Sequence, residues 1–183
     1  FRLSRWYVNL LELADETFTG HFLFIDLSLS IEEIKSRVRR SIKSIINKGL
    51  RDWSIQVHEN PTNELFERFR LLHKEVAGKS TRPLKSWNMQ KFQIECKESF
   101  LVTASDDKNC LVGAGLFAYS ENLAEYMSAA YKRELFNKPF SHAVQMKAIE
   151  TLKNKKIKWY ELGQKYLAID KNKNPATKKE LSI

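Results

Sequence analysis

The residue types that could carry chemistry gather near residue 160 of this 183-residue chain. Glu161 lies in the otherwise apolar segment WYELG, residues 159–163. A carboxylate is costly to bury without a partner, and burial raises its pKa towards the range of a useful general base. Glu161 is therefore a candidate catalytic base. The alternative is a structural carboxylate at a strand edge, paired with a nearby lysine.

A second group of candidates precedes Glu161, where a helix is expected to begin. Ser141 and His142 stand at this start, and Lys138 lies three residues earlier. Free N–H groups and the helix dipole favour an anion there, so we expect a phosphate or oxyanion site, with His142 as a second catalytic candidate. Lys132 and Arg133 could meet phosphates through their side chains. Alternatively, Ser141 is a plain N-cap and His142 a surface residue.

The elements that must position these residues alternate between strands and helices. Ser30 and Glu33 form a capping box that opens a basic helix with apolar residues at helical spacing, and Gly49 is expected to end that helix. From Ser99 the hydrophobic period changes to two, which predicts an antiparallel meander. The expected strands are 21–28, 53–57, 100–105, 110–119, 124–131 and 158–163, and the expected helices are 31–48, 60–77, one from about 86, and 141–153. This order predicts an α+β fold with a central, mostly antiparallel sheet flanked by helices.

Composition excludes several classes of protein. With 43% hydrophobic residues, 6 Gly and 4 Pro, the chain is neither disordered nor collagen-like, and its length suits one globular domain. No apolar run approaches the roughly 20 residues that span a bilayer, and no signal peptide is recognisable, so we expect a soluble, cytoplasmic protein. Cys96 and Cys110 fit no metal-ligand spacing; no metal site is expected, and both are expected to be buried. The net charge of +9 favours a polyanionic partner.

Four motifs, in this order, resemble the FemAB-like branch of the GNAT (N-acyltransferase) superfamily. They are a basic helix (RVRRSIKSIINKG, 37–49), LLHKEVAGKSTRP from Leu71, a Gly-bearing strand pair (LVGAGLFAYSENLAEYMSAAY, 111–131) and WYELG. The resemblance covers roughly residues 25–183. It implies a GNAT-like acyltransferase fold in which two strands part around the acyl donor. It also implies that residues 51–183 form a GNAT-like lobe that is truncated at its C-terminal end. Residues 1–50 would then be a partial segment, either the remnant of a first lobe or a link to it.

The resemblance further implies transfer of an acetyl, other acyl or aminoacyl group onto an amine. The acceptor would be an amino-sugar or a peptide precursor in cell-envelope or polysaccharide biosynthesis. The donor would be an acyl-CoA such as acetyl-CoA, or an aminoacyl-tRNA, which makes tRNA a candidate partner. Lys138, Ser141, Lys132 and Arg133 would then bind the donor. Substrate binding would fall to Arg82, Trp87, Tyr126, Gln164 and Lys165.

One departure from the superfamily pattern concerns the donor. Ordinary acetyl-CoA enzymes hold the pyrophosphate on a glycine-rich loop ahead of a helix. The corresponding stretch here, residues 131–145 (YKRELFNKPFSHAVQ), contains no glycine. We therefore expect a donor held mainly by charge. A different class of function also fits the charge, namely a non-catalytic RNA-binding module that uses the basic helix, although no RRM, KH or zinc-knuckle signature is present.

Overall fold

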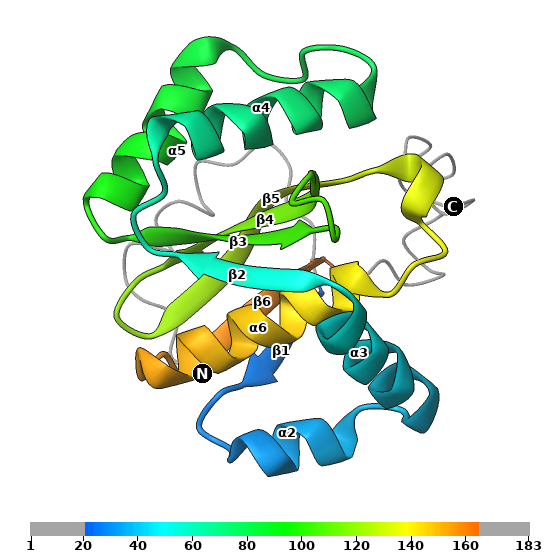
Figure 1. Ribbon diagram of the computed structural model, residues 1–183. Coiled ribbons are helices and arrows are strands. Elements are labelled where there is room, and N and C mark those ends of the chain that lie inside the picture. Colours follow the sequence, from blue (N-terminus) through cyan, green and yellow to red (C-terminus); the bar gives the residue numbers. More distant parts are fainter. Residues whose placement is uncertain (1–20, 165–183) are drawn as a thin grey trace, which may run out of the picture. The chain divides into compact units, whose positions relative to one another are not determined.

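The structure of the protein is a computed structural model that describes residues 21–164 (Figure 1). The chain divides into two compact units, residues 24–163 and residues 1–23 with 164–183. Only residues 21–23 and 164 of the second unit are described. The account below therefore concerns the larger unit. The predicted division into residues 1–50 and 51–183 stays a prediction.

A six-stranded mixed sheet forms the centre of the fold, in the order β1-β6-β5-β4-β3-β2. Strands β2 to β5 pair antiparallel in chain order, and β6 joins β5 in parallel. The expected α+β class and mostly antiparallel sheet are confirmed. The strands are β1 (Phe22–Asp26), β2 (Ser54–His58), β3 (Ser99–Ser105), β4 (Leu111–Tyr119), β5 (Leu123–Tyr131) and β6 (Trp159–Gln164).

Helices cover both faces of this sheet, as Figure 1 shows. One face carries α4 and α5, whose Phe69 and Trp87 pack on Leu101 and Leu116. The opposite face carries α6, whose Val144 and Leu152 belong to the same buried cluster as Phe117. Helix α3 packs on α6. The helices are α2 (Ile31–Arg37), α3 (Arg40–Asp52), α4 (Asn63–Ala77), α5 (Leu84–Glu95) and α6 (Phe140–Asn154), with a short 3-10 turn η1 (Arg133–Leu135).

The expected single helix 31–48 was wrong, because the chain breaks at Val38. The Ser30–Glu33 capping box is confirmed, but Val38 is extended (φ −70°, ψ 135°) and separates α2 from α3. Ile34 and Ile46 are both buried. In one continuous helix, residues twelve apart would lie about 120° apart around the axis. The break lets both side chains be buried.

Three smaller expectations also fail. Gly49 does not end a helix but lies inside α3. Cys96 and Cys110 are both exposed, not buried, because each lies in a turn at the end of an element. Ser141 is not the N-cap of α6. That position belongs to Pro139, and no side chain caps the helix. Gly78, by contrast, ends α4 in the left-handed conformation (φ 69°), as expected of a helix stop.

Candidate functional site

The feature of the sheet that resembles a substrate site is the parting of β5 from β6. The two strands pair in parallel at only three positions, Leu123–Trp159, Ala124–Tyr160 and Glu125–Glu161. The expectation that these strands lie side by side is confirmed. Beyond Glu125, β5 continues to Tyr131 with no strand on this edge among residues 21–164. Unpaired backbone groups on such an edge need partners, and a bound ligand can supply them.

A β-bulge in β5 decides which side chains line this region. Leu116 pairs with Ser128 and the next residue, Phe117, pairs with Tyr126, so Met127 is the extra residue. Residues five apart on a regular strand point to opposite faces. Because the bulge shifts the alternation by one, Tyr126 and Tyr131 share a face, and their hydroxyls lie 2.9 Å apart.

A glycine makes room for this tyrosine pair. A Cβ on Gly113 would overlap the ring of Tyr131 and come within 2.8 Å of the Phe140 ring. Tyr131 pairs with Gly113 across β4 and β5, and its ring lies 5.8 Å from that of Phe140. The absence of a side chain at Gly113 therefore lets Tyr131 lie against the sheet beside the start of α6.

Gln145 of α6 joins the tyrosines to β6. The hydroxyl of Tyr160, a fully buried residue of β6, donates a 2.6 Å hydrogen bond to Oε1 of Gln145. Burial raises the pKa of Tyr160 and of Tyr126, and it raises that of Tyr131 well above its ordinary value. All three phenols therefore keep their protons at neutral pH. We call Tyr126, Tyr131, Tyr160 and Gln145 the tyrosine cluster.

The first turn of α6 lies beside this cluster and offers a place for an anion. A cavity of about 60 Å³ is bounded by Tyr131, Leu135, Phe136, Lys138, Phe140 and Ser141. The first turn of α6 carries no acidic residue and no side-chain cap, so its leading N–H groups lack the usual capping partner. Ser141 Oγ lies 3.5 Å from Nδ1 of His142, which is itself exposed. The structure thus brings Lys138 and Ser141 together at one cavity.

The other predicted donor residues lie in the connection from β5 to α6. Lys132 follows β5 and approaches Glu134 at 3.9 Å, while Arg133 opens η1 and is exposed. The cavity-lining residues do not include either of them. Their contact with a donor stays a prediction.

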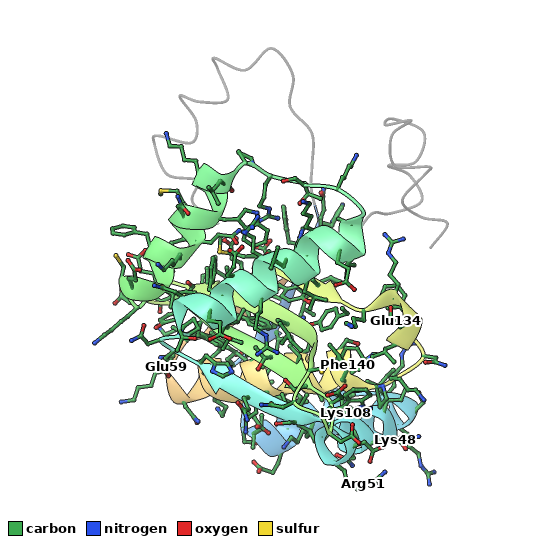
Figure 2. All side chains as sticks on the ribbon, turned by 45° about the horizontal axis from the view of Figure 1, so that its top comes forward. Lys48, Arg51, Glu59, Lys108, Glu134 and Phe140 are labelled. Atoms are coloured by element: carbon green, nitrogen blue, oxygen red, sulfur yellow. The ribbon has the colours of Figure 1, made fainter. Side chains whose placement is uncertain are left out.

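Helix α3 extends positive charge from this end of α6. Gly49 of α3 packs directly on Pro139 and Ala143, which puts the two helices in close contact. Lys48 and Arg51 flank Gly49, and Figure 2 shows them on the same side of the view as Phe140. Arg51 pairs with Asp52 at 2.9 Å, whereas no ion pair to Lys48 is present among residues 21–164.

Glu161 lies on the other side of the sheet from the tyrosine cluster. Its neighbour Tyr160 belongs to the core under α6, and consecutive strand residues alternate between faces. Glu161 is half-buried and stands beside the exposed Glu125 across the parallel strand pair. Within the described ranges no lysine or arginine pairs with Glu161.

The loop between α4 and α5 forms a compact cluster of its own. The Arg82 guanidinium lies 5.2 Å from the centre of the Trp87 ring, and His73 contacts the same ring edge-on at 5.1 Å. Burial and the nearby Arg82 charge lower the pKa of His73. Trp87 is only 4% exposed, so it supports Arg82 rather than presenting its own face to solvent. Of the remaining predicted residues, Gln164 is the last described one, and Lys165 lies outside the described residues.

A second hollow is a shallow groove of about 490 Å³ between β2 and α6. Its charged residues are already paired. Lys155 contacts Glu59 at 2.9 Å, and Lys147 contacts Glu150 at 3.8 Å. The groove therefore offers no free charge from these pairs to a ligand.

No metal or membrane element is seen in the part of the chain that the structure describes. The His, Cys, Asp and Glu residues of 21–164 form no group of three that could hold a metal ion. In the same range, every helix is too short or too polar to cross a bilayer.

The sequence led us to expect that Tyr126 and Tyr131 could line the gap between the strands, but it did not lead us to select Tyr160 or Gln145. Gln145 sits one turn after Ser141 on α6, and that i, i+4 spacing was the available signal. The sequence could not show that Tyr131 lies on the same face as Tyr126, because that depends on the bulge at Met127.

Comparison with known proteins gives a likeness of fold. No protein-family model and no curated protein matches the chain. Among solved structures, FemX superposes with a TM-score of 0.66 at 12% identity, over 81% of this chain and 54% of that one. L-PGS from Bacillus licheniformis superposes with a TM-score of 0.60 at 14% identity, over 81% of this chain and 46% of that one. A tandem GNAT protein from the clavulanic acid biosynthesis pathway superposes with a TM-score of 0.51 at 12% identity, over 79% of this chain and 44% of that one.

The chain thus spans about half the length of the solved structures that it matches. In this chain β5 and β6 pair briefly and then part, with α6 as the crossover between them. At these identities the likeness concerns architecture, which matches the family resemblance seen in the sequence. This chain has the GNAT fold, in the form found in FemX and in lysylphosphatidylglycerol synthetases.

Proposed function

We propose that this protein is an acyltransferase that moves an acyl or aminoacyl group from an activated donor onto an amine. The observation that carries the proposal is the parting of β5 and β6 after three paired positions, beside the uncapped start of α6. An open strand edge suits the extended arm of an acyl donor, because its amide groups can pair with the backbone. A helix start suits the donor's phosphates.

The donor in this proposal is held mainly by charge. Lys138 and Ser141 meet its phosphate at the α6 cavity, and Lys132 and Arg133 add charge nearby. The glycine-free stretch 131–145 supplies no close backbone cradle of the usual kind. Acetyl-CoA or another acyl-CoA fits these contacts. An aminoacyl-tRNA fits them equally and would also use the basic surface of α3, where phosphate contacts release counterions.

The acceptor in this proposal is an amine such as an amino-sugar or a peptide precursor of the cell envelope or a polysaccharide. Glu161, half-buried beside Glu125, takes the ammonium proton. His142, exposed at the first turn of α6, is the second candidate for proton transfer. The acceptor-side residues proposed are Arg82, which the buried Trp87 supports, and Tyr126, Gln164 and Lys165.

The test is a transfer assay with the 183-residue chain. Radiolabelled acetyl-CoA and radiolabelled lysyl-tRNA are each offered with glucosamine and with a peptide that carries a free lysine side chain. We expect acylated amine, identified by mass spectrometry, from one donor and not the other. Absence of transfer from both donors to either acceptor contradicts the proposal.

A second candidate function is a non-catalytic RNA-binding module, which the basic surface of α2 and α3 favours. Within residues 31–52, seven residues are basic and three are acidic. This module would be supported if the chain binds RNA that carries no aminoacyl group, loses affinity steeply between low and moderate salt, and shows no transfer in the assay above.

A further inference from the structure

Helix α5 is apolar on two opposite sides. Trp87 and Ile94 belong to the core beneath the helix and are only 4% and 3% exposed. Met89 and Phe92, by contrast, are each 56% exposed. Each of these two lies two residues from one of the buried pair, which places it about 160° away around the helix axis. The side of α5 that faces away from the sheet therefore carries a second set of apolar side chains.

These exposed side chains form one row along α5. Lys85, Met89, Phe92 and Cys96 follow one another at spacings of four, three and four residues, so they share one side of the helix. All four are exposed, as is Leu84 at the first position of α5. Of the four most exposed large apolar side chains within residues 21–164, three belong to this helix. We call Leu84, Lys85, Met89, Phe92 and Cys96 the α5 surface.

The neighbouring helix α4 shows a different outer side. Glu67 and Lys74 lie there, and Leu71 is the one large apolar residue of α4 that is exposed. Surface helices are usually polar on the side away from the core. Several exposed apolar side chains on one surface indicate a site that contacts a partner or a membrane. The α5 surface therefore has the composition of an interaction surface, and the outer side of α4 does not.

The charge around the α5 surface is positive. Residues 79–97 contain five basic residues and one acidic residue, Glu95, which gives a net charge of +4. Glu95 pairs with Lys91 at 3.6 Å. Within residues 21–164, three lysines of this segment make no ion pair, namely Lys79, Lys85 and Lys97. A lysine can pack its methylene groups on apolar material and still place its ammonium group in a polar layer.

The partner of such a surface must offer apolar volume and negative charge together. A second copy of this chain does not, because a symmetric contact would bring two segments of net charge +4 against each other. RNA offers the charge, but its bases stack on aromatic rings and offer little to Leu84 and Met89. A bilayer that contains anionic lipids offers acyl chains beneath a negatively charged surface. With 12 residues, α5 is long enough to lie on a bilayer and too short to cross one.

We propose that the α5 surface docks this protein on an anionic lipid bilayer. The side chains of Leu84, Met89 and Phe92 enter the boundary between headgroups and acyl chains, and the lysines beside them contact the anionic headgroups. The attachment is peripheral and reversible, since only a few side chains enter the bilayer. This inference goes beyond the proposed acyltransferase function and does not depend on it.

Vesicle flotation with the 183-residue chain measures the attachment. One set of vesicles is phosphatidylcholine alone, and the other contains about 30% phosphatidylglycerol. We expect binding to the anionic vesicles to be at least about tenfold stronger, because each lysine near an anionic surface contributes roughly fivefold. Lys85→Gln should therefore bind them roughly fivefold more weakly. Lys108→Gln, at an exposed position in the turn between β3 and β4, is the matched control and should bind as the wild type does.

The apolar contribution is tested in the same assay. The double variant Met89→Gln and Phe92→Gln should bind anionic vesicles about tenfold more weakly or worse, since it loses apolar area that enters the bilayer. Both side chains are exposed, so the melting temperature should stay that of the wild type. Phe136→Gln is the matched control. Phe136 is an exposed apolar residue outside α5, and its loss should change vesicle binding by less than about twofold.

Two exposed cysteines allow the contact to be located. Cys96 lies on the α5 surface, and Cys110 lies just before β4, outside it. Acrylodan attached to Cys96 in a Cys110→Ser variant should shift its emission to shorter wavelength when anionic vesicles are added. The same dye on Cys110 in a Cys96→Ser variant should show no shift.

Several results would overturn the docking proposal. They are equal binding to both kinds of vesicle, unchanged binding in the Met89→Gln and Phe92→Gln variant, and equal dye shifts at the two cysteines. Absence of vesicle binding would also overturn it. If the double variant then loses affinity for single-stranded RNA, or dissociates a dimer in sedimentation velocity, the α5 surface belongs to RNA or to a second copy instead. Failure of the transfer assay leaves this inference standing, because vesicle binding is measured without any acyl donor.

Discussion

Gly49 of α3 lies so close to Pro139 that a Cβ at Gly49 would stand 2.6 Å from the Pro139 carbonyl oxygen. The same Cβ would stand 2.9 Å from that of Ala143. Pro139 is the N-cap of α6, so this contact fixes the start of α6 against α3. The Pro139 oxygen belongs to the backbone and a Cβ has no side-chain torsion that moves it, so neither atom can move aside by rotating a side chain.

Gly49→Ala should therefore destabilise the protein. Alanine is about 1 kcal/mol better than glycine inside a helix, but overpacking against a backbone carbonyl costs about 1–3 kcal/mol. The difference is a net loss of about 0–2 kcal/mol, and we expect about 1 kcal/mol in the free energy of unfolding, measured by urea denaturation. Ser44→Ala, on an exposed position of the same helix, should change stability by less than about 0.5 kcal/mol. A Gly49→Ala variant as stable as that control would mean that α3 and α6 are farther apart.

The second prediction concerns the proposed base. Glu161→Gln should lower kcat about 10²-fold and leave the melting temperature unchanged, because the amide keeps the shape of the side chain and loses its basicity. The measurements are the steady-state rate of transfer, with whichever donor supports transfer in the assay proposed above, and the melting temperature.

Glu125→Gln tests the neighbouring strand, since Glu125 stands directly beside Glu161. A larger loss in Glu125→Gln than in Glu161→Gln would assign proton removal to Glu125. Glu121→Gln, in the exposed turn between β4 and β5, is the matched control and should keep full activity. Full activity in Glu161→Gln would make Glu161 a structural carboxylate.

How much of the fold and of the candidate site could be predicted from the sequence depends on whether each feature is determined locally. The three meander strands, the α6 crossover and the Gly78 helix stop follow from period and turn residues, and all three are confirmed. Gly49 was misread because a glycine that ends a helix and one that permits a close helix contact look identical in sequence. Which of the two it is depends on Pro139, ninety residues away.

The tyrosine cluster could not be predicted for a related reason. Alternation along a regular strand assigns Tyr126 and Tyr131 to opposite faces, and only the bulge at Met127 brings their hydroxyls together. No residue in β5 marks that bulge. Gln145 and Tyr160, fifteen residues apart, meet only because α6 crosses back over the sheet.

The third prediction concerns the anion site at the start of α6. Lys138→Met should weaken donor binding roughly tenfold and make the affinity less dependent on salt, since one charge-assisted phosphate contact is lost. Isothermal titration at 50 and 200 mM salt measures both effects. Lys74→Met, which removes an exposed lysine from α4, is the control and should leave both unchanged. Equal salt dependence in the Lys138 variant and the control would place the phosphate elsewhere.

The last prediction concerns the pH dependence of stability. Burial lowers the pKa of His58 and of His73 below 6.5, and the Arg82 charge lowers that of His73 further. The unfolded chain therefore binds more protons than the folded one as the pH falls past 6.5, so the stabilisation is complete above about pH 7.5 and declines on acidification. Urea unfolding should show lower stability at pH 5.5 than at pH 7.5.

The double variant His58→Gln and His73→Gln should flatten this dependence, because glutamine can keep the hydrogen bond that His58 makes to Thr103 and does not titrate. His142→Gln, at an exposed position, should leave the slope as in the wild type. A double variant with the wild-type slope would show that other groups take up the protons on unfolding.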